Sequence, residues 1–82
     1  MTMRVGIVSR ASLSRDDRSF GVNLTVKISE GEVFVAHIPF EQMAEFFISN
    51  DLGTLSDVEG KPCYYEEDGP RGACKFVRMW RR

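Results

Sequence analysis

The residue types that could carry out chemistry are scarce in this chain. Its 82 residues include one histidine, His37, and two cysteines, Cys63 and Cys74. A structural zinc site needs four nitrogen or sulfur ligands, which these three residues cannot supply. A catalytic thiol would need a base placed beside it, and no spacing here predicts one. We therefore interpret His37 as a surface residue of a strand and both cysteines as small apolar core residues, with a cross-strand disulfide as the lesser alternative.

Acidic and glycine-rich segments do not predict a catalytic centre either. The densest acidic run is Glu66, Glu67 and Asp68, at the tip of an expected hairpin. A hydrolase needs two carboxylates facing one deep cleft, which a small sheet with one helix does not provide. The glycines of residues 69–72 lack the spacing of a phosphate-binding loop. We expect no enzymatic activity, no metal and no cofactor.

The strongest chemical pattern is the alternation of cations with aromatic and sulfur side chains in residues 75–82. Stacking aromatics beside basic groups are what single-stranded nucleic acid binding requires. The alternative reading makes Phe76 and Trp80 core residues and the arginines solubilising ends. Adding the cations of the first strand, the candidate nucleic-acid surface consists of Arg4, Arg10, Lys75, Arg78, Trp80, Arg81 and Arg82.

Charge is segregated along the chain, although the formal net charge is only -1. Residues 1–27 carry five cations and two acids, and residues 71–82 carry five cations and no acid. The middle, residues 28–70, carries ten acids and one lysine. Such blocks either complement each other in the fold or face partners. The acidic middle could therefore occupy a site built for nucleic acid.

Apolar alternation predicts three strands, over residues 4–13, 22–28 and 32–38. In the first, Val5, Ile7, Ala11 and Leu13 are expected to share the buried face. A three-residue turn ending at Gly31 sets the register of the next two strands. The expected pairs are Ile28–Glu32, Val26–Phe34, Leu24–Ala36 and Val22–Ile38 on one face, and Lys27–Val33, Thr25–Val35 and Asn23–His37 on the other.

The period then changes to that of an amphipathic helix after Pro39. Its expected buried stripe consists of Phe40, Met43, Ala44, Phe47 and Ile48, which leaves Phe46 off the stripe. Two further strands, residues 63–67 and 73–80, are expected to pair Tyr65 with Cys74 and Cys63 with Phe76 around a four-residue loop.

These elements predict one α+β domain over residues 1–82, a small antiparallel sheet with one amphipathic helix packed on a face, in the order β-β-β-α-β-β. No apolar run approaches the length of a membrane span, and no signal peptide is recognisable. Two cysteines are too few for a disulfide-stapled secreted scaffold. We expect a cytoplasmic protein with reduced thiols.

Several short segments resemble a family of short, functionally uncharacterised proteins encoded by bacteriophages and prophages. The matching segments are Ala11-Ser12-Leu13, Asn23-Leu24-Thr25-Val26, Leu52-Gly53 and Leu55 to Cys63, and together with the order of elements they cover about half of the chain. The family usually has His-Gly after its acidic pair, where this chain has Arg18-Ser19. The resemblance implies a phage accessory protein, such as an antagonist of host defence, and carries over no site residues.

The leading hypothesis is a small non-enzymatic binding protein that occupies a surface of a host protein. One helix can cover only one face of the sheet, so apolar groups on the other face need a partner. The alternatives are a nucleic-acid-binding protein using the basic first and last strands, and a structural homodimer, since twofold dimers are the commonest oligomers. The candidate protein-binding residues are Val33, Val35, Phe46, Glu66, Glu67 and Asp68.

Overall fold

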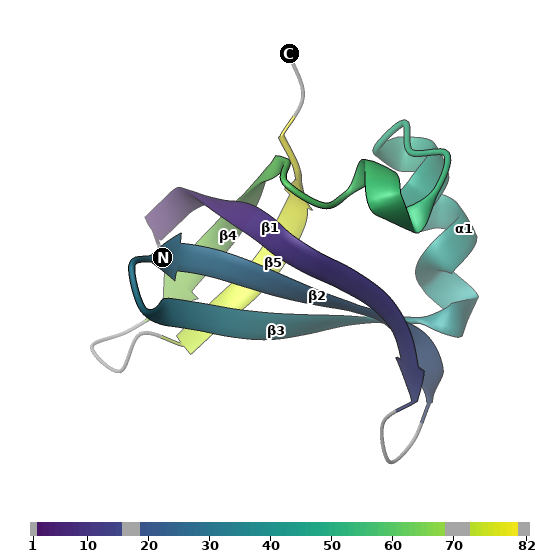
Figure 1. The fold of residues 1–82 in the computed structure, drawn as a ribbon, viewed down its shortest axis with the longest axis horizontal. Helices are drawn as coiled ribbons and strands as arrows, with labels where there is room; N and C mark the ends of the chain where they lie inside the picture. The colour runs from purple at the N-terminus through teal and green to yellow at the C-terminus, as the bar shows by residue number, and fades with distance from the viewer. Residues whose placement is uncertain (1, 16–18, 69–72, 81–82) are drawn as a thin grey trace.

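The computed structural model describes residues 2–15, 19–68 and 73–80. Within them, all strands belong to one antiparallel sheet of order β3-β2-β1-β4-β5 (Figure 1). No helix in this part of the chain is long and apolar enough to cross a membrane. In chain order the elements are β1 (Thr2–Arg15), β2 (Phe20–Ser29), β3 (Glu32–Pro39), α1 (Phe40–Ser49), the 3-10 helix η1 (Leu55–Asp57), β4 (Pro62–Asp68) and β5 (Ala73–Met79).

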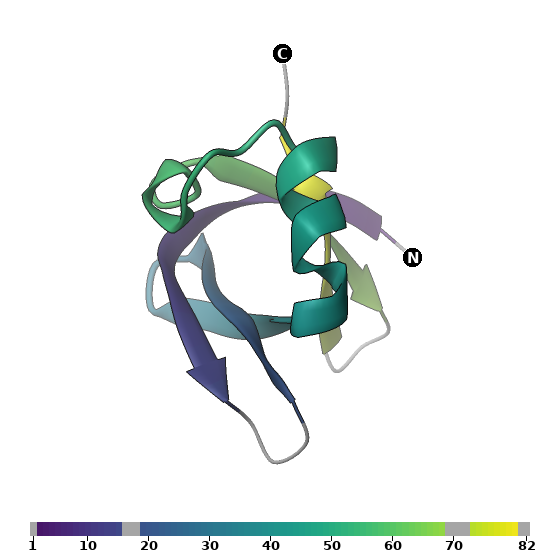
Figure 2. The ribbon, with the colours of Figure 1, turned by 90° about the vertical axis from the view of Figure 1, so that its right-hand side faces the viewer.

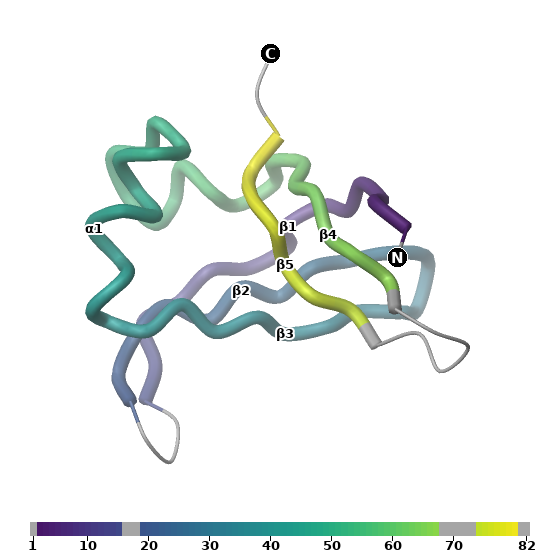
Figure 3. The backbone as a smooth tube through the Cα atoms, turned by 180° about the vertical axis from the view of Figure 1, so that it is seen from behind, coloured from purple at the N-terminus to yellow at the C-terminus, as the bar shows by residue number. Residues whose placement is uncertain are grey.

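The sheet is strongly curled because its long central strand, β1, pairs with a different neighbour along each half. β1 pairs with β4 over its first half, up to Ile7, and with β2 from Ile7 onward. The strands bend into an incomplete ring, and α1 lies across one end of it (Figure 2). The two edge strands, β3 and β5, approach each other on the back of the molecule (Figure 3).

This arrangement corrects the predicted fold class. We expected a small α+β layer in the order β-β-β-α-β-β with the helix packed on one face of the sheet. Instead, strands dominate the described chain, the sheet curls into a half-barrel, α1 covers an end rather than a face, and η1 stands between α1 and β4. With β1 paired to both β2 and β4, and β3 and β5 as opposed edges, the strand order is that of the OB-fold, a partly open five-stranded barrel.

A β-bulge decides which side chains of β1 face the interior. The register of β1 with β2 shifts between Val8 and Arg10. Val8 is fully buried, whereas Val5 and Ile7 are 53% and 43% exposed. We expected Val5 and Ile7 to point inward together with Ala11, which packs against the core. That expectation is wrong, because the extra residue at the bulge reverses the alternation of the strand.

Gly6 lies on the inner face of β1, where the curl leaves no room for a side chain. A Cβ atom at this position would lie 2.8 Å from Val26 Cγ1 and 3.1 Å from the carbonyl oxygen of Lys27. Real Cβ atoms essentially never approach a heavy atom to less than 3.0 Å. Glycine therefore allows β1 to pass close to β2 at the centre of the barrel.

The predicted register of the β2–β3 hairpin is confirmed except at its turn. Gly31 has a φ of 82°, which fits the left-handed turn position that was expected to set the register. Glu32 pairs with Ser29 and not with Ile28, because the ladder shifts between Lys27 and Ser29. The confirmed pairs are Val22–Ile38, Asn23–His37, Leu24–Ala36, Thr25–Val35, Val26–Phe34 and Lys27–Val33.

The predicted register of β4 with β5 is wrong. Tyr65 pairs with Phe76, and Cys63 pairs with Met79. Cys74 lies opposite Glu67, so the two cysteines are not neighbours on one sheet face. The ladder also shifts between Tyr64 and Tyr65, which no sequence pattern indicated. The loop expected at Gly69-Pro70-Arg71 lies outside the described residues.

The helix turns a different face to the core than its apolar pattern predicted. Phe46 is 7% exposed and belongs to the core, with Met43 and Phe47 packed against it. Phe40 and Ile48 of the expected stripe are 64% and 79% exposed. The Phe46 ring lies 5.6 Å from Phe47 and 5.8 Å from Phe76. The other buried core residues are Val8, Val22, Leu24, Val26, Val58, Cys63 and Met79.

Candidate protein-binding surface

The convex outer face of the curled sheet carries a band of exposed aliphatic side chains. Ile7 on β1 lies opposite Lys27 on β2, which lies opposite Val33 on β3. Val33 and Val35 are 58% and 62% exposed, as the sequence predicted for the face away from the helix. Val5 and Met3 continue the band along β1, with 53% and 52% of their surface exposed. We call Met3, Val5, Ile7, Val33 and Val35 the outer patch.

The alternation of side chains between the two faces of each strand explains why these apolar residues face solvent. On β2 and β3 the inner positions, such as Leu24 and its partner Ala36, fill the core. Thr25 and its partner Val35 take the alternate positions and point outward. On β1 the bulge puts Ile7 on the same outer side. Sequence reasoning found the β3 half of the outer patch and missed the β1 half.

Cations lie within the outer patch and beside it. Lys27 lies between Ile7 and Val33, and its aliphatic stem can cover apolar surface while its ammonium group stays in water. Arg10 is exposed beside Thr25 in the next row of the sheet. The Arg78 guanidinium lies 4.6 Å from the centre of the Tyr64 ring, a cation–π contact. The aliphatic groups of β1 and those of β3 therefore lie on either side of Lys27.

Most acidic side chains of the described chain lie elsewhere. Glu41 and Glu45 are exposed on α1, and Asp51 and Glu59 are exposed in the segments that follow it. Two acids are exceptions: Glu66 lies opposite Met3 on the outer face, and Glu30 lines a cavity together with Val5, Ile7 and Lys27. The segregation seen along the sequence thus becomes a difference between the convex sheet face and the helix end.

The candidate nucleic-acid residues do not all share one face. Arg10, Lys75 and Arg78 are exposed at outer-face positions. Arg4 lies opposite Tyr65 on the inner side, and its Nε is 3.2 Å from Glu67 Oε2. Trp80 is 41% exposed just after β5, with its backbone N–H donating to the Pro62 carbonyl oxygen at 3.0 Å. Arg81 and Arg82 lie outside the described residues.

Three of the candidate protein-binding residues need correction or restriction. Phe46, expected to project from the helix toward a partner, is buried in the core. Glu67 points to the inner side of the barrel rim, where it meets Arg4. Asp68 pairs with Ala73 at the end of β4, but its side chain lies outside the described part of the chain. Of the acidic tip, Glu66 alone is described on the outer face.

A polar relay connects the beginning of β2 to β3. His37 Nε2 lies 2.8 Å from Ser19 Oγ, and His37 Nδ1 lies 2.7 Å from Asn23 Oδ1. Because Asn23 Oδ1 can only accept, Nδ1 of the ring donates. The three side chains are partly buried, and their order of hydroxyl, imidazole and carboxamide resembles a nucleophile relay. We interpret the relay as a tie between the two strands.

The two thiols have different surroundings. Cys63 is fully buried, and burial raises the pKa of its thiol to about 11. Cys74 is half-buried, and desolvation together with the nearby Glu67 and Glu32 carboxylates raises the pKa of its thiol. Both thiols are therefore protonated at neutral pH and weakly nucleophilic. Within the described residues, no group of three or more His, Cys, Asp and Glu side chains comes together as a metal site.

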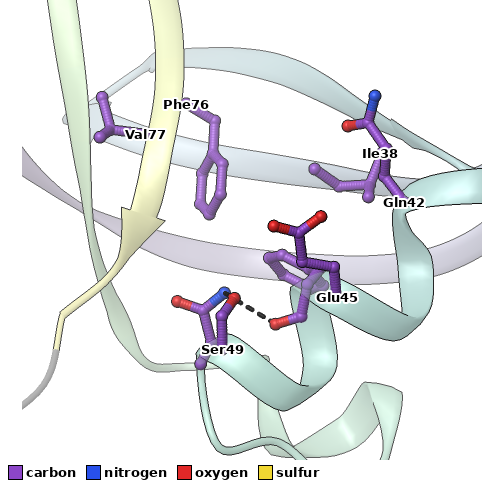
Figure 4. A pocket seen from close by; sticks show the side chains of 8 residues that line it. Ile38, Gln42, Glu45, Ser49, Phe76 and Val77 are labelled. Carbon is purple, nitrogen blue, oxygen red and sulfur yellow. Dashed lines mark hydrogen bonds between the residues drawn. The ribbon is translucent and has the colours of Figure 1, made fainter.

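A cavity lies between the helix and the edge of β5 (Figure 4). Its volume is about 280 Å³, and Phe76, Glu45 and Gln42 point into it. A second cavity of about 310 Å³ continues along β3 and β5, and the two share Ile38, Gln42 and Phe76. Val35 of the outer patch also lines the second cavity, so this cavity borders the patch.

No family model, curated protein or solved structure matches this chain.

Proposed function

We propose that this protein is a non-enzymatic binding module that recognises another protein through the outer patch. The supporting observation is the exposure of the patch. Its five aliphatic side chains are 43% to 62% exposed, while their inward neighbours Val8, Val26 and Leu24 are fully buried. Exposed apolar groups gathered on one face beside polar and charged groups are typical of protein interaction sites.

The chemistry of the patch favours a protein over a nucleic acid. Binding of single strands relies on aromatic platforms on which bases stack. The described outer positions of β2 and β3 hold no Phe, Tyr or Trp, and Tyr64, opposite Val5 on the outer face, already carries the Arg78 guanidinium over its ring. They are occupied by Asn23, Thr25, Lys27, Val33, Val35 and His37. Aliphatic groups interspersed with cations instead fit an apolar protein surface that also carries carboxylates.

The resemblance to phage and prophage proteins gives the partner its context. If the chain is a phage accessory protein, the partner is a protein of the bacterial host, and binding takes place in the host cytoplasm. The effect is inhibition by occupancy, for example of a component of a defence system. This proposal needs no catalytic group and no cofactor in the small protein itself.

The test compares lysine substitutions at two exposed aliphatic positions, one inside the outer patch and one on the helix. Val35→Lys places a charge in the outer patch, whereas Ile48→Lys places one on the helix, where Ile48 is 79% exposed. Tagged wild type and both variants are incubated with host lysate, and captured proteins are quantified by mass spectrometry. We expect one protein to be enriched by wild type and by Ile48→Lys and depleted by Val35→Lys. Equal recovery by all three would contradict the proposal.

A homodimer through the same surface is a separate outcome of the same design. Sedimentation equilibrium at micromolar concentration measures the mass of the chain, which is 9.3 kDa as a monomer. A dimer that is lost in Val35→Lys and retained in Ile48→Lys would make a second copy the occupant of the patch. If wild type and both variants are monomers, the partner that binds the patch is a different protein.

Nucleic-acid binding is the second candidate, favoured by the OB-type strand order and by the outer-face cations. Arg10, Lys27, Lys75 and Arg78 lie on the convex side, and the acids Glu66 and Glu30 lie near them. Phosphate contacts release counterions, so the affinity for single-stranded DNA would fall steeply with salt. The chain is applied to single-stranded DNA at low salt. Retention of wild type, with weaker retention of Arg10→Ala and Arg78→Ala, would support this function. If wild type were not retained at low salt, the nucleic-acid-binding hypothesis would be contradicted.

A further inference from the structure

A stripe of polar side chains on α1 forms one wall of the cavity beside β5. Gln42, Glu45 and Ser49 recur at i, i+3 and i+7, a spacing that places them on one face of the helix. All three are exposed, and Figure 4 shows the Gln42 and Glu45 side chains reaching into the cavity. This wall therefore presents carboxylate, carboxamide and hydroxyl oxygens, which are hydrogen-bond acceptors.

The opposite wall is apolar and includes an aromatic ring. Ile38 on β3 and Phe76 on β5 are half-buried, pack against the core and line the cavity. The Phe76 ring points into it (Figure 4). The π-system of an aromatic ring attracts a cation that lies over its face. The cavity thus brings a carboxylate and an aromatic ring to the same space.

The charges around the cavity favour a positively charged occupant. Glu45 is the charged residue among the eight described residues that line it. Within the described part of the chain, no cation lies at ion-pair distance from Glu45. The cavity also borders the C-terminal end of α1 at Asn50, the negative end of the helix dipole, and the last turn of this described helix carries no basic side chain. Lys75 lines the adjoining cavity and not this one.

We propose that this cavity binds an arginine side chain of a partner protein, with the guanidinium between the Glu45 carboxylate and the Phe76 ring. The volume of about 280 Å³ is slightly below the roughly 300–1,000 Å³ of pockets for drug-sized ligands, so it suits a single side chain. A guanidinium is planar, stacks on aromatic rings and donates several hydrogen bonds, whereas the ammonium of lysine is a compact charge without a face to stack. Arginine is also enriched among the residues that anchor interfaces in pockets. The site goes beyond the proposed function, because no residue of the outer patch lines it.

The test uses small probes that differ in charge but hardly in shape. Nα-acetyl-arginine methylamide is titrated into the protein, and chemical shifts are followed by NMR. The control probe is the citrulline analogue, which has the same length and a neutral ureido group. We expect saturable binding of the arginine probe, with shifts of the Phe76 ring and of the Gln42 side-chain amide. The dissociation constant of the citrulline probe should be about threefold higher or more, which is within the range for an exposed ion pair.

Two carboxylates of the same helix provide matched variants. Glu41 and Glu45 are both exposed on α1, but Glu45 lines the cavity and Glu41 does not. Glu45→Gln should raise the dissociation constant of the arginine probe about threefold, and Glu41→Gln should leave it unchanged. No saturable binding, equal affinity for both probes, or equal effects of the two substitutions would each overturn the proposal. A lysine probe that binds as tightly as the arginine probe would overturn the choice of a guanidinium.

Discussion

Truncation of Phe46 tests how the helix is seated on the barrel. Phe46 is 7% exposed, and its ring packs within 5.6 Å of Phe47 and 5.8 Å of Phe76, measured between ring centres. Removing a buried phenylalanine ring leaves a cavity and costs about 3–5 kcal/mol. Small domains have a total free energy of unfolding of about 5–15 kcal/mol. We therefore expect Phe46→Ala to lose a large share of the stability of this protein.

The control is another apolar residue of the same helix. Ile48 is 79% exposed, so Ile48→Ala should change the free energy of unfolding by no more than about 0.5 kcal/mol. Both variants are unfolded in urea and followed by far-ultraviolet circular dichroism, with the slope compared to confirm a two-state transition. If Ile48→Ala cost as much as Phe46→Ala, the helix would face the core through the stripe that its sequence pattern suggested, and the seating described here would be refuted.

Three further predictions concern single residues. Gly6→Ala should be destabilising although alanine favours strands no less than glycine, because its Cβ would meet Val26 Cγ1 at 2.8 Å; a melting temperature equal to wild type would contradict this. Asp57 accepts hydrogen bonds from the backbone N–H groups of Gly53 and Thr54 at 2.8 and 2.9 Å, which lower the pKa of its carboxyl group. Its contribution is present above the ordinary carboxyl pKa and is lost as the pH falls through the lowered value, so Asp57→Asn should flatten the acid side of the stability–pH curve. The pKa of Cys63 is about 11 in the folded chain against 9.0 normally, so its contribution to stability is complete below about pH 9 and declines toward pH 11; Cys63→Ala should lack this alkaline decline.

The hairpin of β2 and β3 is the part of the fold that its sequence predicts best. Strict alternation and the turn at Gly31 determine the register, because a slip by one residue would turn every apolar side chain outward. The same information predicts that Val33 and Val35 are exposed. Where the ladder contains a bulge, alternation no longer identifies the face. For this reason the predicted pairing of Ile28 with Glu32 was wrong, and Val5 and Ile7 were wrongly expected in the core.

The helix shows a second limit of pattern reasoning. Met43 and Phe47 belong both to the predicted stripe and to the observed buried face, so the sequence alone cannot decide on which side of them the core lies. The curl of the sheet decides it, because α1 crosses the end of the barrel and buries Phe46. Phe40 instead packs beside Phe20, with ring centres 6.5 Å apart, at the β1–β2 end of the molecule. Long-range geometry of this kind has no local signature.

The cavities between β3 and β5 also required the structure. Their two walls come from strands that are separated in sequence by α1, η1 and β4. The wrong register for β4 and β5 would have placed Cys74 beside Tyr65 and away from Glu67. No periodicity in the chain indicates that β3 and β5 would face each other. Only the pairing of β1 with both β2 and β4 brings the two edges together.

The most direct test of the proposed function is an equilibrium titration of the captured partner against three forms of the protein. The account predicts that Val35→Lys raises the dissociation constant by about tenfold or more, as expected for a charge placed in an apolar interface. It also predicts that Ile48→Lys binds as tightly as wild type and that all three forms share one melting temperature. Equal dissociation constants for Val35→Lys and wild type would contradict the claim that the outer patch binds the partner.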